Sequence, residues 1–153
     1  MSMATDQQPD WATLEPGARL PPLTAGPITR QMLAIYCGAS GDHNPIHVDI
    51  DFARQSGLDD VIAHGMFVMA TSGRLLTGWI PQPAVRSFNA RFLAPTRVGD
   101  EITVTGTVEE KLIEDGEQRV RIQVEACDQT GEAKIKGSAL VAVSETAQRG
   151  AAQ

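Results

Sequence analysis

The hydrophobic periodicity of this chain changes once, near residue 84, and this change constrains the fold more than any other feature. Between residues 29 and 80, apolar residues recur at the three- and four-residue spacing of helices. From residue 85 to residue 143, apolar and polar residues alternate as in strands with one buried face. Such strands need a partner on their apolar face, and the most apolar helical segment is Gly65–Trp79. We therefore predict an α+β fold in which an antiparallel sheet wraps around one central helix.

Local signals place the individual elements. Thr29 is the predicted N-cap of a helix over residues 31–39, and Asp49 that of a short helix that Gly57 ends. Pro81 closes the central helix Gly65–Trp79. Strands are expected over residues 85–92, 102–108, 120–126 and 135–143, with turns at Asp115-Gly116 and Thr130-Gly131.

The length of 153 residues corresponds to one domain. Residues 1–13 and 145–153 are polar or rich in small residues and are predicted to be flexible tails. The domain is expected to span residues 14–144, because no repeat or linker interrupts this stretch.

Composition excludes several classes of function. The net charge is −6, from 13 basic and 19 acidic residues, so the chain has no basic surface for nucleic acid or anionic membranes. Its apolar runs are far shorter than the roughly 20 residues of a membrane helix, and no secretory signal is visible at the N-terminus. Two cysteines, Cys37 and Cys127, cannot form a disulfide framework. We therefore expect a cytoplasmic protein.

Residues 40–47, Ser-Gly-Asp-His-Asn-Pro-Ile-His, are dense in turn-forming types and predict a loop. His43 and His47 have the four-residue spacing of two zinc ligands on one helix. However, Pro45 lies between them and disfavours a helix, and no third ligand of obvious type follows. A metal site is therefore not expected.

An acid–base pair fits the same loop better. Asp42 and His47 lie five residues apart, so both side chains could converge on one water molecule. Addition of water to a polarised double bond requires that one proton be removed and another delivered, which two such groups can share. Turn formation explains every residue of the loop except His47, so a purely structural role stays open for Asp42.

The second feature is Ala63-His64-Gly65-Met66, at the start of the central helix. Gly65 could allow close packing of the helix on the sheet. It could also present a bare backbone N–H at a helix N-terminus, where developing negative charge, such as that of an enolate, is stabilised. In the second interpretation His64 packs or orients this turn and is not the base.

Together these residues resemble a known family. They resemble the hydratase 2 motif of the MaoC-like dehydratases, a family that includes the (R)-specific enoyl-CoA hydratases. The matching residues are Tyr36-x-x-x-Ser40-Gly41-Asp42-x-Asn44-Pro45-Ile46-His47-x-Asp49, followed by Ala63-His64-Gly65-Met66. The family pattern also resembles the downstream Arg91-Phe92-x-x-Pro95-x-x-x-Gly99-Asp100. The similarity covers roughly residues 29–143.

The resemblance implies a hot-dog fold and the reversible hydration of trans-2-enoyl thioesters to (R)-3-hydroxyacyl thioesters, without a cofactor. It implies that Asp42 and His47 hold and activate the water and that the Gly65 N–H is the oxyanion donor. Asn44 would support the loop or the water network. The substrate would be an acyl-CoA or an acyl-carrier-protein thioester.

The resemblance further implies a homodimer, with a higher oligomer or a heterodimer as alternatives. The segment before the central helix would form an overhang over the acyl pocket. Phe52, Met66 and Met69 are candidate pocket walls, although each is equally suited to a core.

Three other functions stay open at this point. The chain could be the motif-bearing subunit of a heterodimeric 3-hydroxyacyl-thioester dehydratase. A hot-dog thioesterase is disfavoured, because such enzymes place an acidic residue at the central helix, and Gly65–Trp79 contains Arg74 as its only charged residue. An acyl-thioester binding module with vestigial catalytic residues is the third alternative.

Overall fold

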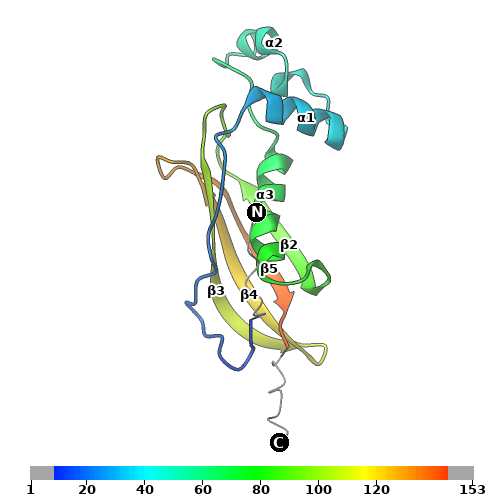
Figure 1. Cartoon of the computed structure of the whole chain (residues 1–153), viewed down its shortest axis with the longest axis vertical. Coiled ribbons are helices and arrows are strands. Elements are labelled where there is room, and N and C mark those ends of the chain that lie inside the picture. Colours follow the sequence, from blue (N-terminus) through cyan, green and yellow to red (C-terminus); the bar gives the residue numbers. More distant parts are fainter. Residues whose placement is uncertain (1–8, 145–153) are drawn as a thin grey trace, which may run out of the picture.

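The structure, a computed structural model, describes residues 9–144. A five-stranded antiparallel sheet of order β1-β3-β4-β5-β2 curves around helix α3 (Figure 1). The strands are β1 (Leu23–Ala25), β2 (Val85–Phe92), β3 (Ile102–Glu114), β4 (Glu117–Cys127) and β5 (Ala133–Ala142). The α-helices are α1 (Arg30–Ser40), α2 (Ile50–Gln55) and α3 (Gly65–Trp79), and short 3-10 helices occur at Pro45–His47 and Gln82–Ala84.

Alternation along the strands gives the sheet one apolar face. Val104 and Val108 of β3 are buried and pair with Ala126 and Ile122 of β4, whereas the intervening Thr105 is exposed. The turn between these strands is Asp115-Gly116, and both residues have positive φ, 55° and 75°, as a tight hairpin of this kind requires. The predicted hairpin is therefore confirmed.

Helix α3 has the predicted bounds, but of its apolar residues at helical spacing, Met66, Met69, Ala70, Gly73 and Leu76, only Leu76 is buried. Its buried side chains are Val68, Thr71, Ser72, Leu75 and Leu76. Thr71 and Ser72 are tolerated there because their hydroxyls donate to the carbonyls of Phe67 and Val68, each at 2.9 Å. Two hydroxyl side chains that are hydrogen-bonded within their own helix are therefore part of the core. A pattern of apolar residues alone does not predict this.

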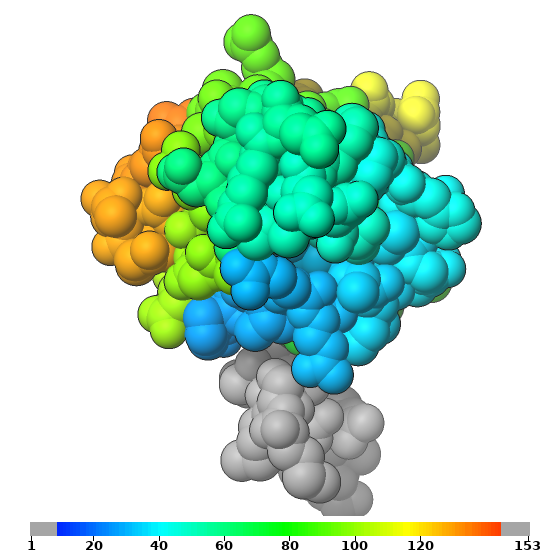
Figure 2. Space-filling view, turned by 90° about the horizontal axis from the view of Figure 1, so that it is seen from above, coloured from blue at the N-terminus to red at the C-terminus, as the bar shows by residue number. Residues whose placement is uncertain are grey.

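The predicted N-caps of α1 and α2 are confirmed. The Thr29 hydroxyl accepts from the Met32 N–H at 3.1 Å, and the Asp49 carboxylate accepts from the N–H groups of Asp51 and Phe52. Both helices lie beyond the N-terminal end of α3, and Figure 2 shows their segment spread over that end of the molecule. This placement is that of the expected overhang.

The strands differ from the expectation in two ways. β1 was not predicted, because only three residues pair with β3 and two prolines precede them, so no alternation is visible. β3 and β4 extend beyond the expected 102–108 and 120–126, and the added residues are mostly polar or charged. Cross-strand ion pairs such as Arg121–Glu110, at 2.7 Å, stabilise this extension, which has few apolar residues to mark it.

Of the predicted flexible tails, residues 1–8 and 145–153 lie outside the described residues. Within the described part, residues 10–13 form a turn, and the Trp11 N–H donates to the Ser144 carbonyl at 3.3 Å.

No helix among residues 9–144 is long and apolar enough to cross a membrane. A sheet wrapped around one long helix is the hot-dog arrangement, so the predicted fold class is confirmed.

Candidate active site

The loop after α1 is shaped by its own short polar side chains. Gly41, with a φ of 76°, ends the helix. The Asp42 N–H donates to the Ser40 hydroxyl, the Asn44 N–H donates to the Asp42 carboxylate at 3.3 Å, and the Ile46 N–H donates to Asn44 Oδ1 at 3.1 Å. These contacts are the turn chemistry that the sequence indicates, and they leave the Asp42 side chain exposed.

His47 lies at the end of the 3-10 helix and is partly buried. Its Nδ1 is 2.7 Å from the carbonyl oxygen of Ile62. Because a carbonyl only accepts, Nδ1 carries the hydrogen in this contact, and the neutral ring then has a lone pair on Nε2. His47 is thereby prepared to accept a proton or a hydrogen bond through Nε2.

His64 is buried beside these two residues. One ring nitrogen of each histidine and a carboxylate oxygen of Asp42 lie within 4.8 Å of one another. The rings of His47 and His64 are stacked, with centroids 3.8 Å apart and planes inclined by 25°. The loop and the start of α3 therefore meet at these three side chains.

Asp42, His47 and His64 could in principle hold a metal ion, but their geometry fits one poorly. Zinc needs ligand atoms that converge at about 2.0–2.2 Å. In two stacked imidazoles the lone pairs lie in nearly parallel planes, so they do not converge on one point. The arrangement is better suited to holding a water molecule between a carboxylate and an imidazole.

Gly65 is the first residue of α3, and no acceptor in the described part of the chain takes its N–H. A Cβ at this position would lie 3.0–3.1 Å from ring carbons of Phe92, so the glycine allows that ring to approach the helix start closely. Gly65 and His47 both line a pocket of about 340 Å³. Its remaining lining residues are mostly apolar: Ile62, Ala63, Val68, Phe92, Leu93, Ala94, Pro95, Thr96, Lys134 and Ile135.

The sequence-based candidates for the pocket wall lie elsewhere. Met66 and Phe52 are 55% and 41% exposed, Met69 is partly buried, and none of the three lines the pocket that contains His47 and Gly65. Their part in binding an acyl group stays a prediction. Sequence reasoning did not single out Phe92 as a site residue, although it stands in the downstream pattern that resembles the family.

A buried ammonium group supports the far wall of this pocket. Lys134 is 2% exposed, and its Nζ lies 3.0 Å from Asp128 and also contacts Glu132. Burial opposes the charged form of Lys134, but the hydrogen bonds to Glu132 and Asp128 outweigh burial and raise its pKa. Lys134 also donates to the carbonyl of Pro95 at 3.0 Å, which fixes one wall segment of the pocket.

Comparison with known proteins identifies the family. The model of the MaoC-like domain matches residues 14–130. The chain belongs to the MaoC-like family. A curated relative of this MaoC-like protein, the (R)-specific enoyl-CoA hydratase of Rhodospirillum rubrum, is 33% identical over 120 residues, which cover 76% of this chain and 80% of the relative.

Other comparisons agree with this assignment. The 3-hydroxybutyryl-CoA dehydratase of Methylorubrum extorquens is 33% identical to this MaoC-like chain over 110 residues, which cover 71% of this chain and 68% of the relative. Among solved structures, the R-hydratase PhaJ1 from Pseudomonas aeruginosa aligns with a TM-score of 0.77 and 30% identity, over 89% of this chain and 86% of the neighbour. The resemblance stated from the motif is therefore confirmed at the level of the family.

Proposed function

We propose that this hydro-lyase adds water reversibly to a trans-2-enoyl thioester and forms the (R)-3-hydroxyacyl thioester. The observation that carries this proposal is the meeting of Asp42 and His47 at the start of α3, next to the Gly65 N–H, which has no acceptor among residues 9–144. The relatives named as hydratases and dehydratases support the same reaction class.

The geometry suggests how the steps of the hydration are divided among Asp42, His47 and Gly65. Asp42 and Nε2 of His47 hold one water molecule, and one of them removes a proton as the water oxygen adds to C3 of the substrate. The electron pair of the double bond moves towards the thioester carbonyl, whose oxygen the Gly65 N–H stabilises. The Asp42–His47 pair then delivers one proton to C2, which restores the carbonyl. Because the pair has taken one proton from water and given one to C2, it returns to its starting protonation state, and no cofactor is consumed.

We place the reacting end of the acyl thioester in the pocket that His47 and Gly65 line, because its other walls are mostly apolar. Either CoA or an acyl carrier protein could present this thioester. Asn44 holds the loop through its hydrogen bond with the Ile46 N–H, so its proposed role is to support Asp42 and His47.

We further propose that the active form is a homodimer. β2 is an outer strand of the sheet, and Phe92 at its end is 52% exposed beside the pocket. The next residue, Leu93, is exposed to the same degree, so a second copy would cover apolar surface near the site. If the protein purified alone is dimeric and active, the alternative of an obligate heterodimeric subunit is excluded.

The catalytic assignment is tested by two substitutions. In D42N the amide oxygen can still accept from the Asn44 N–H, and in H47Q the side chain stays polar, so both variants should fold. Each should lower the rate of enoyl-CoA hydration by about 10²–10⁴-fold, because general acid–base groups contribute about that much. The measurement is the initial rate of loss of the enoyl thioester at fixed enzyme concentration.

The matched control is H43Q, since His43 is an exposed histidine of the same loop and is absent from the cluster. It should hydrate at the parental rate. Near-parental turnover of both D42N and H47Q would reject the assignment. Chromatography of the products separates the proposed activity, which yields hydroxyacyl-CoA, from a thioesterase, which yields free CoA.

A further inference from the structure

His64 carries an imidazole ring at a position where helix formation does not require one. It is the N-cap residue of α3, yet its side chain makes no capping hydrogen bond, and histidine is not a preferred N-cap residue. The residue is 1% exposed, and its Nδ1 has no partner within the described part of the chain. A buried polar atom without a partner costs stability, so its presence calls for another explanation.

The contacts of His64 reach every component of the proposed catalytic machinery. Its Nε2 is 3.1 Å from the carbonyl oxygen of Asp42, to which it donates. Its ring stacks on His47 with centroids 3.8 Å apart and packs edge-to-face with the ring of Tyr36, with centroids 4.9 Å apart. The next residue in the chain is Gly65, the proposed oxyanion donor.

This contact fixes Asp42 itself, whereas the later loop residues Ile46 and His47 are hydrogen-bonded to Ile62. The other hydrogen bonds of Asp42 go to Ser40 and Asn44 within the same exposed loop. The bond to His64 therefore joins residue 42 to α3, across 22 positions of the chain. Without it, the carboxylate could shift relative to His47 and Gly65, and a displacement of about 1 Å can cost about 10²-fold in rate.

We propose that His64 is a positioning residue for the hydration reaction. Its buried ring fixes the Asp42 backbone through the Nε2–H and fixes the ring of His47 by stacking, so that acid, base and oxyanion donor keep a constant spacing. This role rests on the function proposed above, and His64 itself takes up no proton in it.

Two substitutions separate the contributions of the ring. H64F keeps an aromatic ring at this position but removes the donor to Asp42, and it also removes the unpartnered Nδ1. Its kcat should fall about ten- to a hundredfold while its KM stays within about twofold, because substrate binding is not touched. Its melting temperature should not fall. H64Q keeps an N–H donor near the Nε2 position, and its kcat should lie between those of H64F and the parent.

A matched control and a double variant complete the test. S72A alters another fully buried polar side chain of α3, whose hydroxyl bonds only within that helix, and it should leave kcat unchanged. In the D42N background, H64F should have little further effect in single-turnover measurements, since His64 acts through Asp42.

Several results would overturn the role of His64. These are a kcat for H64F within about twofold of the parent, a kcat for H64Q no higher than that of H64F, or a loss in the D42N background as large as in the parent. Parental turnover in D42N and H47Q would instead reject the proposed function, so the two failures are distinguishable.

Discussion

At the scale of single residues, the stacked histidines differ in which ring nitrogen is bonded. His47 uses Nδ1, towards the carbonyl of Ile62, whereas His64 uses Nε2, towards the carbonyl of Asp42. Since each acceptor is a carbonyl, each bonded nitrogen carries the hydrogen. The two neutral rings are therefore opposite tautomers, although they lie only 3.8 Å apart.

This difference can be measured directly, because the chain has three histidines. Nitrogen-15 chemical shifts of labelled histidine at neutral to alkaline pH should show His47 with its hydrogen on Nδ1 and His64 with its hydrogen on Nε2. H47Q and H64Q assign the signals by deletion, and exposed His43, which has no partner among residues 9–144, serves as the reference. The same tautomer for both stacked rings would contradict the hydrogen bonds described here.

The sequence predicted some of these residues better than others. Asp42 and His47 could be proposed together because they lie within one short loop of turn-forming residues. His64 was predicted only to pack against or orient its own turn, since nothing in the chain shows that a residue 22 positions later lies against Asp42. Its ring stack on His47 depends on how α3 meets the loop, which is a tertiary property.

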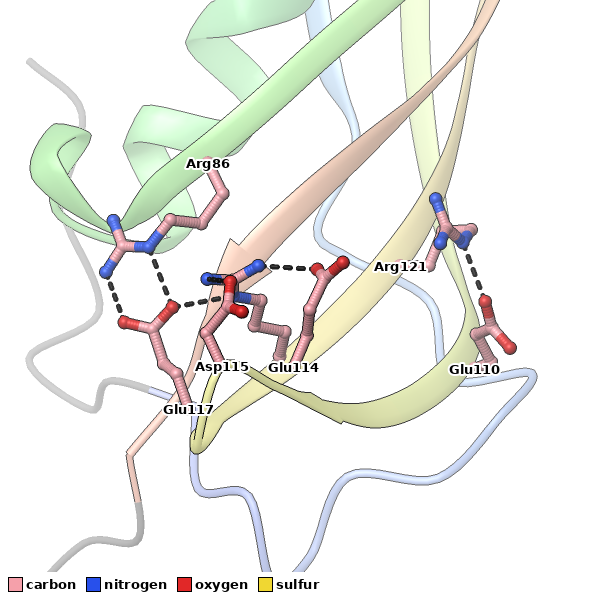
Figure 3. Close-up of polar contacts among 7 residues, drawn as sticks. Arg86, Glu110, Glu114, Asp115, Glu117 and Arg121 are labelled. Carbon is pink, nitrogen blue, oxygen red and sulfur yellow. Dashed lines mark hydrogen bonds and ion pairs between the residues drawn. The ribbon is translucent and has the colours of Figure 1, made fainter.

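At the scale of elements, charged side chains fix the end of the β3–β4 hairpin to the start of β2 (Figure 3). The Glu117 carboxylate binds Arg86 of β2 at 2.5 Å and Arg119 of β4 at 2.7 Å. Hydrogen bonds from Arg86, and then from Arg119, lower the pKa of Glu117 to about 2, from an ordinary value of 4.5. The ionised form of Glu117 is thus favoured in the folded protein.

A pH-dependent contribution to stability follows from this pKa. Because the folded pKa is lower than the unfolded one, the contribution is fully present above about pH 4.5 and is lost as the pH falls towards 2. E117Q should therefore melt below the parent at pH 7, and the difference should shrink between pH 4.5 and pH 2. The control is E101Q, since Glu101 is exposed and has no ion pair among the described residues. A constant difference across this range would contradict the prediction.

The helices and long strands were predictable because their signals are local. Thr29 and Asp49 cap helices that begin directly after them, and Asp115-Gly116 forms a tight turn by itself. β1 was missed because its pairing with β3 lies almost eighty residues away in the chain. The buried face of α3 was missed because it includes Thr71 and Ser72, whose hydroxyls are hydrogen-bonded to carbonyls of the same helix.

At the scale of the whole molecule, Lys134 connects the sheet to the segment that closes the pocket. Its Nζ interacts with Asp128 and Glu132 at the β4–β5 turn and with the Pro95 carbonyl after β2. The neighbouring Thr96 carbonyl accepts from the Ala63 N–H at 2.8 Å, directly before His64. One buried cation thus lines the pocket of the candidate active site and also holds the segment that is hydrogen-bonded to Ala63.

Removal of this cation should destabilise the fold strongly. K134M leaves the carboxylate of Asp128, whose side chain is 7% exposed, without its buried counterion, and breaking a buried pair typically costs about 3–5 kcal/mol. We expect a loss of about 3 kcal/mol in the free energy of unfolding, measured with urea at pH 7. K136M is the matched control, because the Lys136–Glu125 pair is exposed and should contribute less than about 1 kcal/mol. Equal effects of the two substitutions would contradict this prediction.

The proposed catalytic residues Asp42, His47 and Gly65 all lie within residues 42–65, which has a consequence for how this fold can diverge. The sheet needs only alternating apolar side chains and a few fixed positions, such as Gly137, where a Cβ would lie 2.0 Å from the Asn89 carbonyl oxygen. Most outward-facing strand residues can therefore be substituted without loss of the proposed reaction. We expect related chains to change substrate range through the segment between α1 and α3 and through the pocket wall at residues 92–96, on an otherwise constant scaffold.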